Sequence, residues 1–312
     1  MNADQSTGEM PPAPEHRAGF VSVIGRPNVG KSTLMNAYLK QKISIVSPKP
    51  QTTRRRVLGI LTLDAAQIIF VDTPGIHQPH HKLGELMVRT AVETIPDADV
   101  ILWLVDAAHL PTDQDRHIAQ LIERHGAGSP VIIGLNKSDL LPAPEREPRL
   151  QSFVQLLPPT EVLFISATQG ENRKRLLTTL IQHLPPGPCF YPPEQVTDQT
   201  ERAIAAELIR EQILERARHE VPHAVEVIVD EFKARSQTLT FIHATVIVER
   251  ASQRGILLGH KGRMIKSISQ AARKQIEELL GTQVYLELWI KVRPKWRQKD
   301  HELENLGYQR PG

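Results

Sequence analysis

Residues 25–32 read Gly25-Arg26-Pro27-Asn28-Val29-Gly30-Lys31-Ser32 and have the form G-x-x-x-x-G-K-S/T. An apolar run at 20–24 precedes this stretch, and a helix-like run at 32–39 follows it. A phosphate-binding P-loop requires that strand–loop–helix context. The glycines let the backbone turn so that its N–H groups point inward, and the helix N-terminus adds positive potential. In such a loop Lys31 reaches the outer phosphates and the Ser32 hydroxyl binds magnesium.

Unbroken apolar runs alternate with helix-like stretches through the first half of the chain. The runs are 20–24, 68–71, 100–105, 131–135 and 162–165, and the helix-like stretches between them include 82–94, 112–125 and 145–156. Continuous apolar strands separated by helices are typical of a parallel sheet that is buried on both faces. The pattern therefore predicts an α/β P-loop domain with a mostly parallel sheet and helices on both faces.

Three more polar motifs each follow an apolar run, where such sheets bind their ligands. In Asp72-Thr73-Pro74-Gly75, the carboxylate can hold magnesium through a water, and Gly75 lets the backbone approach a γ-phosphate. In Asn136-Lys137-Ser138-Asp139, Asp139 can accept two hydrogen bonds from guanine that adenine does not offer. The backbone of Ser166-Ala167-Thr168 can contact the base carbonyl. Each motif alone also fits an ordinary turn, but their order and shared position favour one nucleotide site.

With these motifs, residues 18–184 resemble a translation-factor-class GTPase, and the P-loop together with Asp-Thr-Pro-Gly is similar to the Era and TrmE branch. The resemblance implies GTP and GDP binding and GTP hydrolysis. It implies phosphate contacts from residues 25–32 and from Asp72 through Ile76, and guanine contacts from Asn136 through Asp139, Ser166 and Ala167. It also implies magnesium ligation by Ser32, by Asp72 through a water, and by Thr53 of the sequence Gln51-Thr52-Thr53-Arg54.

Ile76 stands where Ras-like GTPases keep the glutamine that orients the attacking water. An isoleucine cannot hydrogen-bond water, so we expect slow intrinsic hydrolysis, with water positioned by backbone, a monovalent cation or a partner. Related GTPases with asparagine at the position of Asn28 use K⁺, so Asn28 is the potassium candidate. His77, His80 and His81 have a metal-like spacing, but no cysteine or carboxylate is near them in the sequence, and a mobile polar loop accounts for them.

The second half of the chain predicts a separate domain. Prolines crowd the segment 185–198, which we interpret as a semi-rigid linker between a GTPase domain at 17–184 and a second domain at 199–299. The pattern after the linker has the order α-β-β-α-α-β, at 200–219, 225–229, 241–248, 255–258, 263–280 and 284–292. The motif Gly259-His260-Lys261-Gly262 lies between the two central helices.

This order is similar to a type II KH domain, an α+β RNA-binding module whose GXXG loop clamps about four nucleotides. Basic residues outnumber acidic ones roughly four to one between 250 and 299, which is the electrostatic footprint of a phosphate-binding surface. The expected RNA-binding residues are Gly259, His260, Lys261, Gly262, Arg263 and Lys266. The apolar residues 256–258 fit a bed for unstacked bases and fit a core equally well.

Composition narrows the remaining possibilities. Cys189 is the only cysteine, so no intrachain disulfide forms. Residues 1–16 are polar and predict a disordered tail, whereas 300–312 predicts a tail partly ordered against the second domain. No apolar run is long enough to span a bilayer, and the N-terminus lacks the order of a signal peptide, so we expect a cytoplasmic protein. We also expect a monomer.

A GTPase domain joined to a C-terminal KH domain resembles the Era family of ribosome-biogenesis GTPases over almost the whole chain. The resemblance implies binding to 16S ribosomal RNA near its 3′ end, a role in 30S subunit assembly, and peripheral association with the inner face of the cell membrane. Two alternatives remain open: a GTPase in RNA modification, and an RNA-binding scaffold that is independent of nucleotide state. The lone Cys189 lies in the linker, which argues against the catalytic cysteine of the modification enzymes.

Overall fold

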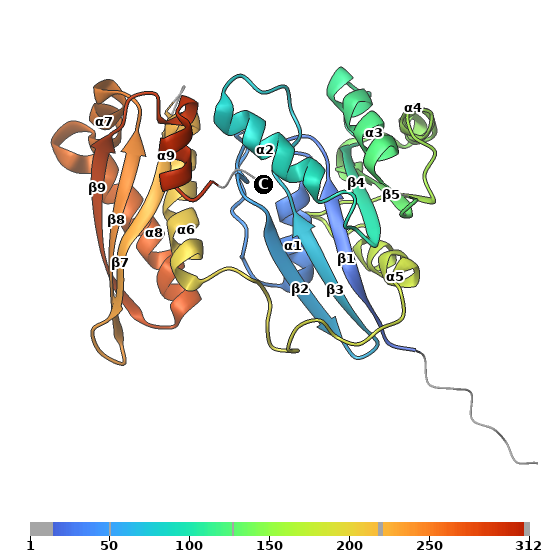
Figure 1. Ribbon diagram of the computed structural model, residues 1–312, viewed down its shortest axis with the longest axis horizontal. Helices are drawn as coiled ribbons and strands as arrows, with labels where there is room; N and C mark the ends of the chain where they lie inside the picture. Colours follow the sequence, from blue (N-terminus) through green and yellow to red (C-terminus); the bar gives the residue numbers. More distant parts are fainter. Residues whose placement is uncertain (1–14, 50, 127, 218–220, 309–312) are drawn as a thin grey trace, which may run out of the picture.

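A six-stranded sheet with the order β2-β3-β1-β4-β5-β6 forms the centre of the N-terminal domain (Figure 1). The computed structural model describes residues 15–49, 51–126, 128–217 and 221–308. Only β2 runs antiparallel to its neighbour. The elements are β1 Arg17–Ile24, α1 Lys31–Leu39, β2 Val57–Leu63, β3 Ala66–Asp72, α2 Lys82–Glu93, β4 Val100–Asp106, α3 Asp113–His125, β5 Val131–Asn136, α4 Arg146–Val154, β6 Glu161–Phe164 and α5 Arg173–His183.

Helices cover both faces of this sheet. One core cluster joins the strands to α1 and α5 through Leu34 and Leu176, and a second joins them to α2, α3 and α4 through Ala91, Ile122 and Phe153. Burial on both faces explains why β3 and β4 are apolar at nearly every position. The predicted fold class, strands and helices are confirmed.

The linker lies along the first domain rather than spanning open solvent. Ile60 N donates to Val196 O at 2.9 Å, and residues 59 and 197 form a β-bridge at the free edge of β2. The side chain of Gln67 accepts from the backbone N–H groups of Phe190 and Tyr191 at 2.7 and 3.0 Å. The proline-rich composition predicts stiffness, and these hydrogen bonds fix where the stiff segment lies.

The second domain has a three-stranded sheet, β7-β8-β9, with the helices α6, α7 and α8 packed on one face (Figure 1). β9 is parallel to β8, and β7 is antiparallel to it. The elements are α6 Glu201–Arg216, β7 Glu226–Ala234, β8 Leu239–Val248, α7 Ala251–Leu258, α8 Arg263–Leu280 and β9 Gln283–Val292. The predicted order α-β-β-α-α-β is confirmed. The helix α7 begins four residues earlier than predicted, because Gln253 accepts from the backbone N–H groups of Glu249 and Arg250 and caps it.

The C-terminal segment packs between the two domains. The helix α9 Asp300–Asn305 and the residues after it bury Leu303, Leu306 and Tyr308 against Trp296 and the α2 side chain Met87. The sequence predicts packing against the second domain, and the structure adds the contact with α2. The predicted disorder of 1–16 falls mostly on residues 1–14, which lie outside the described residues.

Candidate functional site

A cavity of about 530 Å³ opens beyond the carboxyl ends of the strands in the first domain. Eleven of the predicted nucleotide-site residues line it: Pro27, Asn28, Gly30, Lys31, Ser32, Thr53, Gly75, Asn136, Lys137, Asp139 and Ala167. The segment before β2, residues 45–49 and 51–56, is called the switch loop here, and it adds Ile45, Val46, Ser47, Pro48, Gln51 and Thr52 to the lining. Thr33, Leu140 and Thr168 complete the lining. Of these nine residues, the sequence motifs include only Gln51, Thr52 and Thr168. The structure thus gathers residues from all four motifs and from the switch loop around one space.

The other nine residues predicted to contact the nucleotide or magnesium do not line the cavity. Gly25, Arg26, Val29, Asp72, Thr73, Pro74, Ile76, Ser138 and Ser166 are absent from its lining. The Arg26 side chain turns away to pair with Asp115 at 2.7 Å. The Ile76 side chain is 1% exposed and lies in the core, while its N–H donates to Gly25 O at 3.2 Å. Neither side chain faces the cavity, so any phosphate contact from these two residues is a backbone contact.

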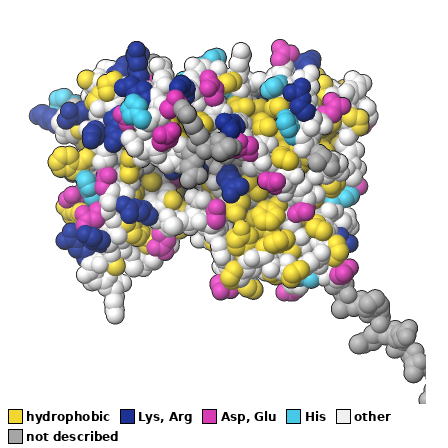
Figure 2. Space-filling view, in the orientation of Figure 1, with side chains coloured by type: hydrophobic (Ala, Val, Ile, Leu, Met, Phe, Trp, Pro, Cys, Tyr) yellow, Lys and Arg dark blue, Asp and Glu magenta, His cyan; other side chains and the backbone are white. Residues whose placement is uncertain are grey.

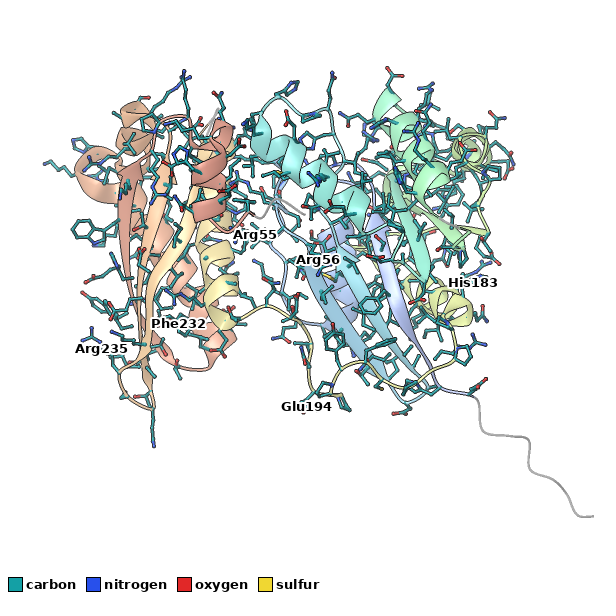
Figure 3. The ribbon with its side chains drawn as sticks, viewed as in Figure 1. Arg55, Arg56, His183, Glu194, Phe232 and Arg235 are labelled. Carbon is teal, nitrogen blue, oxygen red and sulfur yellow. The ribbon has the colours of Figure 1, made fainter. Side chains whose placement is uncertain are left out.

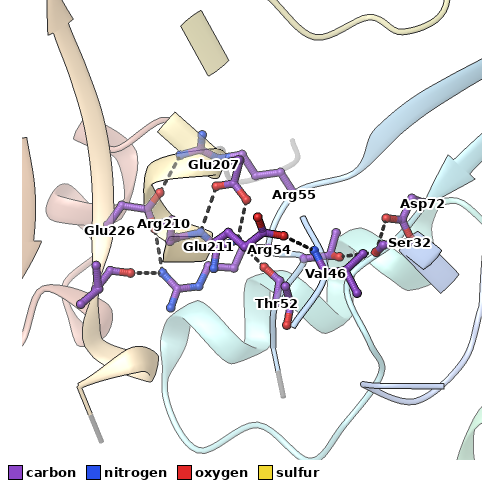
Figure 4. Close-up of polar contacts among 12 residues, drawn as sticks. Ser32, Val46, Thr52, Arg54, Arg55, Asp72, Glu207, Arg210, Glu211 and Glu226 are labelled. Carbon is purple, nitrogen blue, oxygen red and sulfur yellow. Dashed lines mark hydrogen bonds and ion pairs between the residues drawn. The ribbon is translucent and has the colours of Figure 1, made fainter. Parts of the chain in front are cut away.

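Three oxygen-bearing side chains meet at one side of the cavity. Ser32 Oγ lies 2.9 Å from Thr53 Oγ1 and donates to Asp72 Oδ2 at 2.7 Å (Figure 4). Asp72 is fully buried, and its Oδ1 has no hydrogen-bond partner among the described residues. A buried carboxylate oxygen without a partner is costly unless a cation or water satisfies it. Hard oxygen ligands with one unsatisfied carboxylate fit Mg²⁺.

Lys31 lies beside this oxygen cluster and is 6% exposed. Its Nζ donates to the carbonyls of Gly25 and Arg26 at 3.1 and 2.9 Å. Burial lowers the pKa of Lys31 to about 8, although the Asp72 carboxylate opposes that shift. Burial also raises the pKa of Asp72, while Lys31 and the Ser32 hydroxyl act in the opposite direction. Anionic phosphate oxygens in the cavity would favour the charged form of Lys31.

Asp139 is an exposed carboxylate in the lining of the cavity. The neighbouring residues Asn136 and Lys137 are held in place by hydrogen bonds and an ion pair. Asn136 donates to Val29 O at 2.7 Å and accepts from Ala167 N at 2.9 Å, so it ties the P-loop to the loop after β6. Lys137 lines the cavity, and its Nζ forms an ion pair with Asp106 at 2.7 Å. We conclude that Asn136 holds the two loops of this site together, whereas Asp139 is exposed at the cavity.

Close backbone approach explains two glycines of the site, Gly30 of the P-loop and Gly75 after β3. A Cβ on Gly75 would lie 2.5 Å from Pro27 N, and one on Gly30 would lie 2.3 Å from the amide nitrogen of Asn136. Gly30 also has a φ of 103°, which L side chains rarely adopt. Asn28 has a φ of 64°, and its amide nitrogen donates to Pro48 O at 2.7 Å. Asn28 therefore joins the P-loop to the switch loop.

Two of the three histidines after Gly75 have structural partners, and His80 is exposed. His77 lies 2.8 Å from Gly75 O and 2.9 Å from the Gln51 amide, and His81 accepts from Gly84 N as the N-cap of α2. In the part of the chain that the structure describes, no group of three histidine, cysteine or carboxylate side chains is arranged to hold a metal.

The switch loop before β2 is bound to the second domain, a contact that the sequence motifs do not indicate (Figure 4). Arg54 follows Thr53 and donates to Glu226 and to Val225 O at 2.7 and 2.6 Å. Arg210 of α6 is fully buried and donates to Thr52 O. Burial acts to raise the pKa of Glu207, but the Arg210 charge and hydrogen bonds hold that pKa below its usual range. We call the contacts of Arg54, Glu226, Arg210 and Thr52 the switch clamp.

The G-x-x-G motif forms a tight turn between α7 and α8. Gly259, Lys261 and Gly262 have φ of 67°, 51° and 76°. Lys261, Arg263 and Lys266 are exposed around it. Figure 2 shows Lys and Arg side chains gathered over the α7 end of this domain. Of the apolar residues 256–258, the central leucine is buried, and Ile256 and Leu258 are 44% and 37% exposed. We call Gly259, Lys261, Gly262, Arg263 and Lys266 the turn surface.

Comparisons with known proteins cover almost the whole chain. Residues 20–137 match the family model described as 50S ribosome-binding GTPase, and residues 220–297 match the KH domain model. The GTPase Era of Rippkaea orientalis is 49% identical over 97% of this chain and 96% of the relative, and that of Heliobacterium modesticaldum is 44% identical over 94% and 97%. The chain belongs to the Era family of GTPases.

Solved structures agree with this assignment. A structure of Era in complex with MgGDPNP and nucleotides 1506–1542 of 16S ribosomal RNA matches with a TM-score of 0.90 at 40% identity, covering 94% of this GTPase and 99% of that chain. Era from Aquifex aeolicus bound to GDP and AlF4⁻ matches with a TM-score of 0.89 at 40% identity over the same shares. The resemblance stated from the motifs is confirmed.

Proposed function

We propose that this GTPase is a nucleotide-controlled switch that binds 16S ribosomal RNA near its 3′ end and assists 30S subunit assembly. The observation that carries the proposal is the switch clamp, because it joins the GTP-site loop to the domain that bears the turn surface. The solved relative that holds both MgGDPNP and a 16S RNA fragment supports it.

In this proposal each site residue has a distinct task. Bound Mg²⁺ neutralises charge on the β- and γ-phosphates. Ser32 and Thr53 hold it directly, and Asp72 holds it through a water. Lys31 contacts the outer phosphates, and Asp139 accepts two hydrogen bonds from guanine. The buried Ile76 leaves water positioning to another group, so intrinsic turnover is slow.

We propose K⁺ as a second cation, with Asn28 as its protein ligand. The support is the P-loop asparagine, which lies on the cavity and bonds to the switch loop. Turnover should be faster in K⁺ than in Na⁺ for the wild type, and the difference should vanish in Asn28→Ala. Equal rates in both salts for both proteins would refute a potassium role.

The cellular location and the oligomeric state that we propose rest on membership of the Era family. We propose a cytoplasmic monomer with peripheral association at the inner face of the membrane. Among the described residues, no helix has the length and apolar character needed to cross a bilayer. Flotation with vesicles of anionic and of neutral lipids would test the membrane association, and sedimentation would test the oligomeric state.

RNA recovery in the two nucleotide states is the decisive experiment. The GTPase loaded with a non-hydrolysable GTP analogue should recover 16S RNA enriched at its 3′ end, and the GDP form should recover less. Equal recovery in both states would favour a nucleotide-independent scaffold. Enrichment of transfer RNA instead would favour the RNA-modification alternative.

A further inference from the structure

The outer face of the second domain's sheet carries four rings, two of which are exposed and two half-buried. On β8 and β9, alternate residues point away from the helices, and Phe241 and His243 stand opposite Tyr285 and Glu287 in the strand register. Tyr285 and Trp289 are 56% and 67% exposed. The other two tryptophans of the chain are both fully buried. An exposed tryptophan leaves a large apolar surface in water, which marks a binding site when other rings lie beside it.

These rings are ordered by contacts with one another. The rings of Phe241 and Tyr285 stack with centroids 5.9 Å apart and an interplanar angle of 17°. The ring of His243 meets Trp289 edge to face at 6.0 Å. The Arg235 guanidinium lies 4.3 Å from the Phe241 centroid, at the β7–β8 end of the domain (Figure 3). We call Arg235, Phe241, His243, Tyr285 and Trp289 the aromatic face.

Part of the same sheet face is covered by the C-terminal segment. Toward α9, Ile228 and Ile247 pack against the cluster that contains Trp296 and Leu303. That cover does not include Tyr285 and Trp289, which remain exposed. Tyr285 and Trp289 are four residues apart on one side of β9, so their Cα atoms lie about 13 Å apart. That spacing gives room for several stacked bases between the two rings.

The edge strand β9 lies between the aromatic face and the helices α7 and α8 that carry the turn surface. The inward side of β9, including Leu286 and Leu288, packs with the core that α7 and α8 share. β9 is also the edge strand of its sheet, so a polymer held at the turn between α7 and α8 reaches the outer face by crossing one strand. A single strand of RNA is such a polymer, and bases stack on aromatic side chains without regard to sequence.

The charges of this face are compatible with a phosphate backbone. Glu231 pairs with Lys233 at 2.5 Å, and Asp230 accepts from the Thr245 hydroxyl at 2.6 Å. Lys291 is exposed on the outward side of β9, in register with Ile247. The carboxylates of β7 are therefore already partnered, and the guanidinium of Arg235 stacks as nucleic-acid-binding arginines do. Glu287 is the remaining carboxylate on the outward side of β9.

We propose that the aromatic face is a second RNA platform, on which Tyr285 and Trp289 stack bases of single-stranded RNA flanking the segment held by the turn surface. This inference rests on the proposed RNA-binding function and extends the RNA site to the opposite side of β9. RNA longer than the segment at the turn would gain affinity from these rings, whereas a tetranucleotide would not.

Two RNA lengths separate the platform from the turn surface. The probes are labelled single strands of about four and about 16 nucleotides with the same repeated sequence, titrated against the full-length GTPase with Mg²⁺ and a non-hydrolysable GTP analogue. Trp289→Ala should weaken the longer RNA about tenfold and leave the short one unchanged. Trp289→Tyr should restore most of the affinity. Phe190→Ala, which removes a 56% exposed ring from the linker, is the matched control and should change neither.

Tryptophan emission gives a direct readout, because the two other tryptophans are fully buried. The longer RNA should quench wild-type emission, the short RNA should not, and Trp289→Phe should abolish the quenching. Unchanged long-RNA affinity in Trp289→Ala would overturn the platform, as would a monomer–dimer shift in that variant without any RNA effect. If the wild type binds neither RNA, the proposed RNA function fails instead.

Discussion

The guanidinium of Arg54 and the carboxylate of Glu226 lie 2.7 Å apart across the domain boundary, and both side chains are 3% exposed. Arg54 directly follows Thr53, so the ion pair anchors the loop that carries the proposed magnesium ligand. A buried pair contributes little relative to an apolar pair, but loss of one partner leaves an uncompensated charge. The boundary between the domains therefore constrains the nucleotide site.

Arg54→Ala should destabilise the protein by about 3 kcal/mol, because Glu226 would keep only Tyr308 and the more distant Arg55 as partners. The freed loop should also weaken binding of the magnesium complex of GTP. Urea unfolding and nucleotide titration measure the two effects. Arg55→Ala removes a 47% exposed side chain 3.6 Å from the same carboxylate and should have a smaller effect on both. Equal effects of the two variants would contradict the role given to the buried pair.

Asp139→Asn should change the base that the cavity accepts. Two hydrogen bonds to a charged group are lost with guanine, so GTP affinity should fall about 100-fold. Xanthosine triphosphate carries a carbonyl in place of the guanine amine and should bind the variant better than it binds the wild type. Competition titrations with both nucleotides measure this exchange. Unchanged GTP affinity would show that Asp139 does not read the base.

Substitutions of the two glycines in the turn, Gly259 and Gly262, should have different effects. A Cβ on Gly259 would lie 2.7 Å from the Cβ of Met264, whereas one on Gly262 would meet nothing within 4 Å. Gly259→Ala should therefore destabilise the second domain. Gly262→Asp should remain folded, apart from strain at its φ of 76°, and should lose RNA binding by repelling phosphates.

Thermal unfolding and RNA anisotropy separate these outcomes, with GTP affinity as the control for an intact first domain. Lys261→Ala should weaken every RNA similarly and reduce the salt dependence by about one phosphate contact. Normal RNA binding by a folded Gly262→Asp protein would remove the turn surface from the RNA site.

Stability should fall in mild acid through His81. Burial and the neighbouring Arg297 charge lower the pKa of His81 from 6.5 to about 4. The unfolded chain then binds more protons than the folded one in this interval, so the free energy of unfolding decreases as pH falls from about 6.5 towards 4. Protonation also removes the acceptor for Gly84 N at the start of α2.

His81→Asn keeps an N-cap acceptor and should reduce the difference in Tm between pH 7 and pH 5. The exposed His80 offers a matched control, His80→Asn, which should leave the difference as it is in the wild type. If His81→Asn retains the full pH dependence, another group is responsible.

Much of the nucleotide site is predictable because parallel strands end at one edge of a sheet. Asp72 and Asp139 follow different strands, and that rule alone brings their motifs to one cavity. The rule does not say which side chains face the cavity. Asn136 lines the cavity but its side chain holds two loops together, and Ile76 enters the core. Those orientations depend on packing that residue spacing does not encode.

The contacts of the switch clamp could not be predicted from the sequence for a different reason. Arg210 contacts Thr52, and the two residues are 158 positions apart in separate domains. A buried arginine on an otherwise ordinary helix indicates an unusual partner but does not identify it. The aromatic face was missed because Tyr285 and Trp289 fit a strand core as well as an outer surface until the register of β9 is known.

The hydrogen bonds that hold the linker to β2 limit how far the second domain can travel. The last of them join Leu58 to Thr197 and Asp198, and α6 begins at Glu201. The free tether is thus only a few residues long, whereas the segment between the domains has 14. A short tether gives the docked surfaces a high effective concentration for each other. When the switch clamp opens, the second domain should pivot near Gln199 and dock again quickly rather than diffuse away.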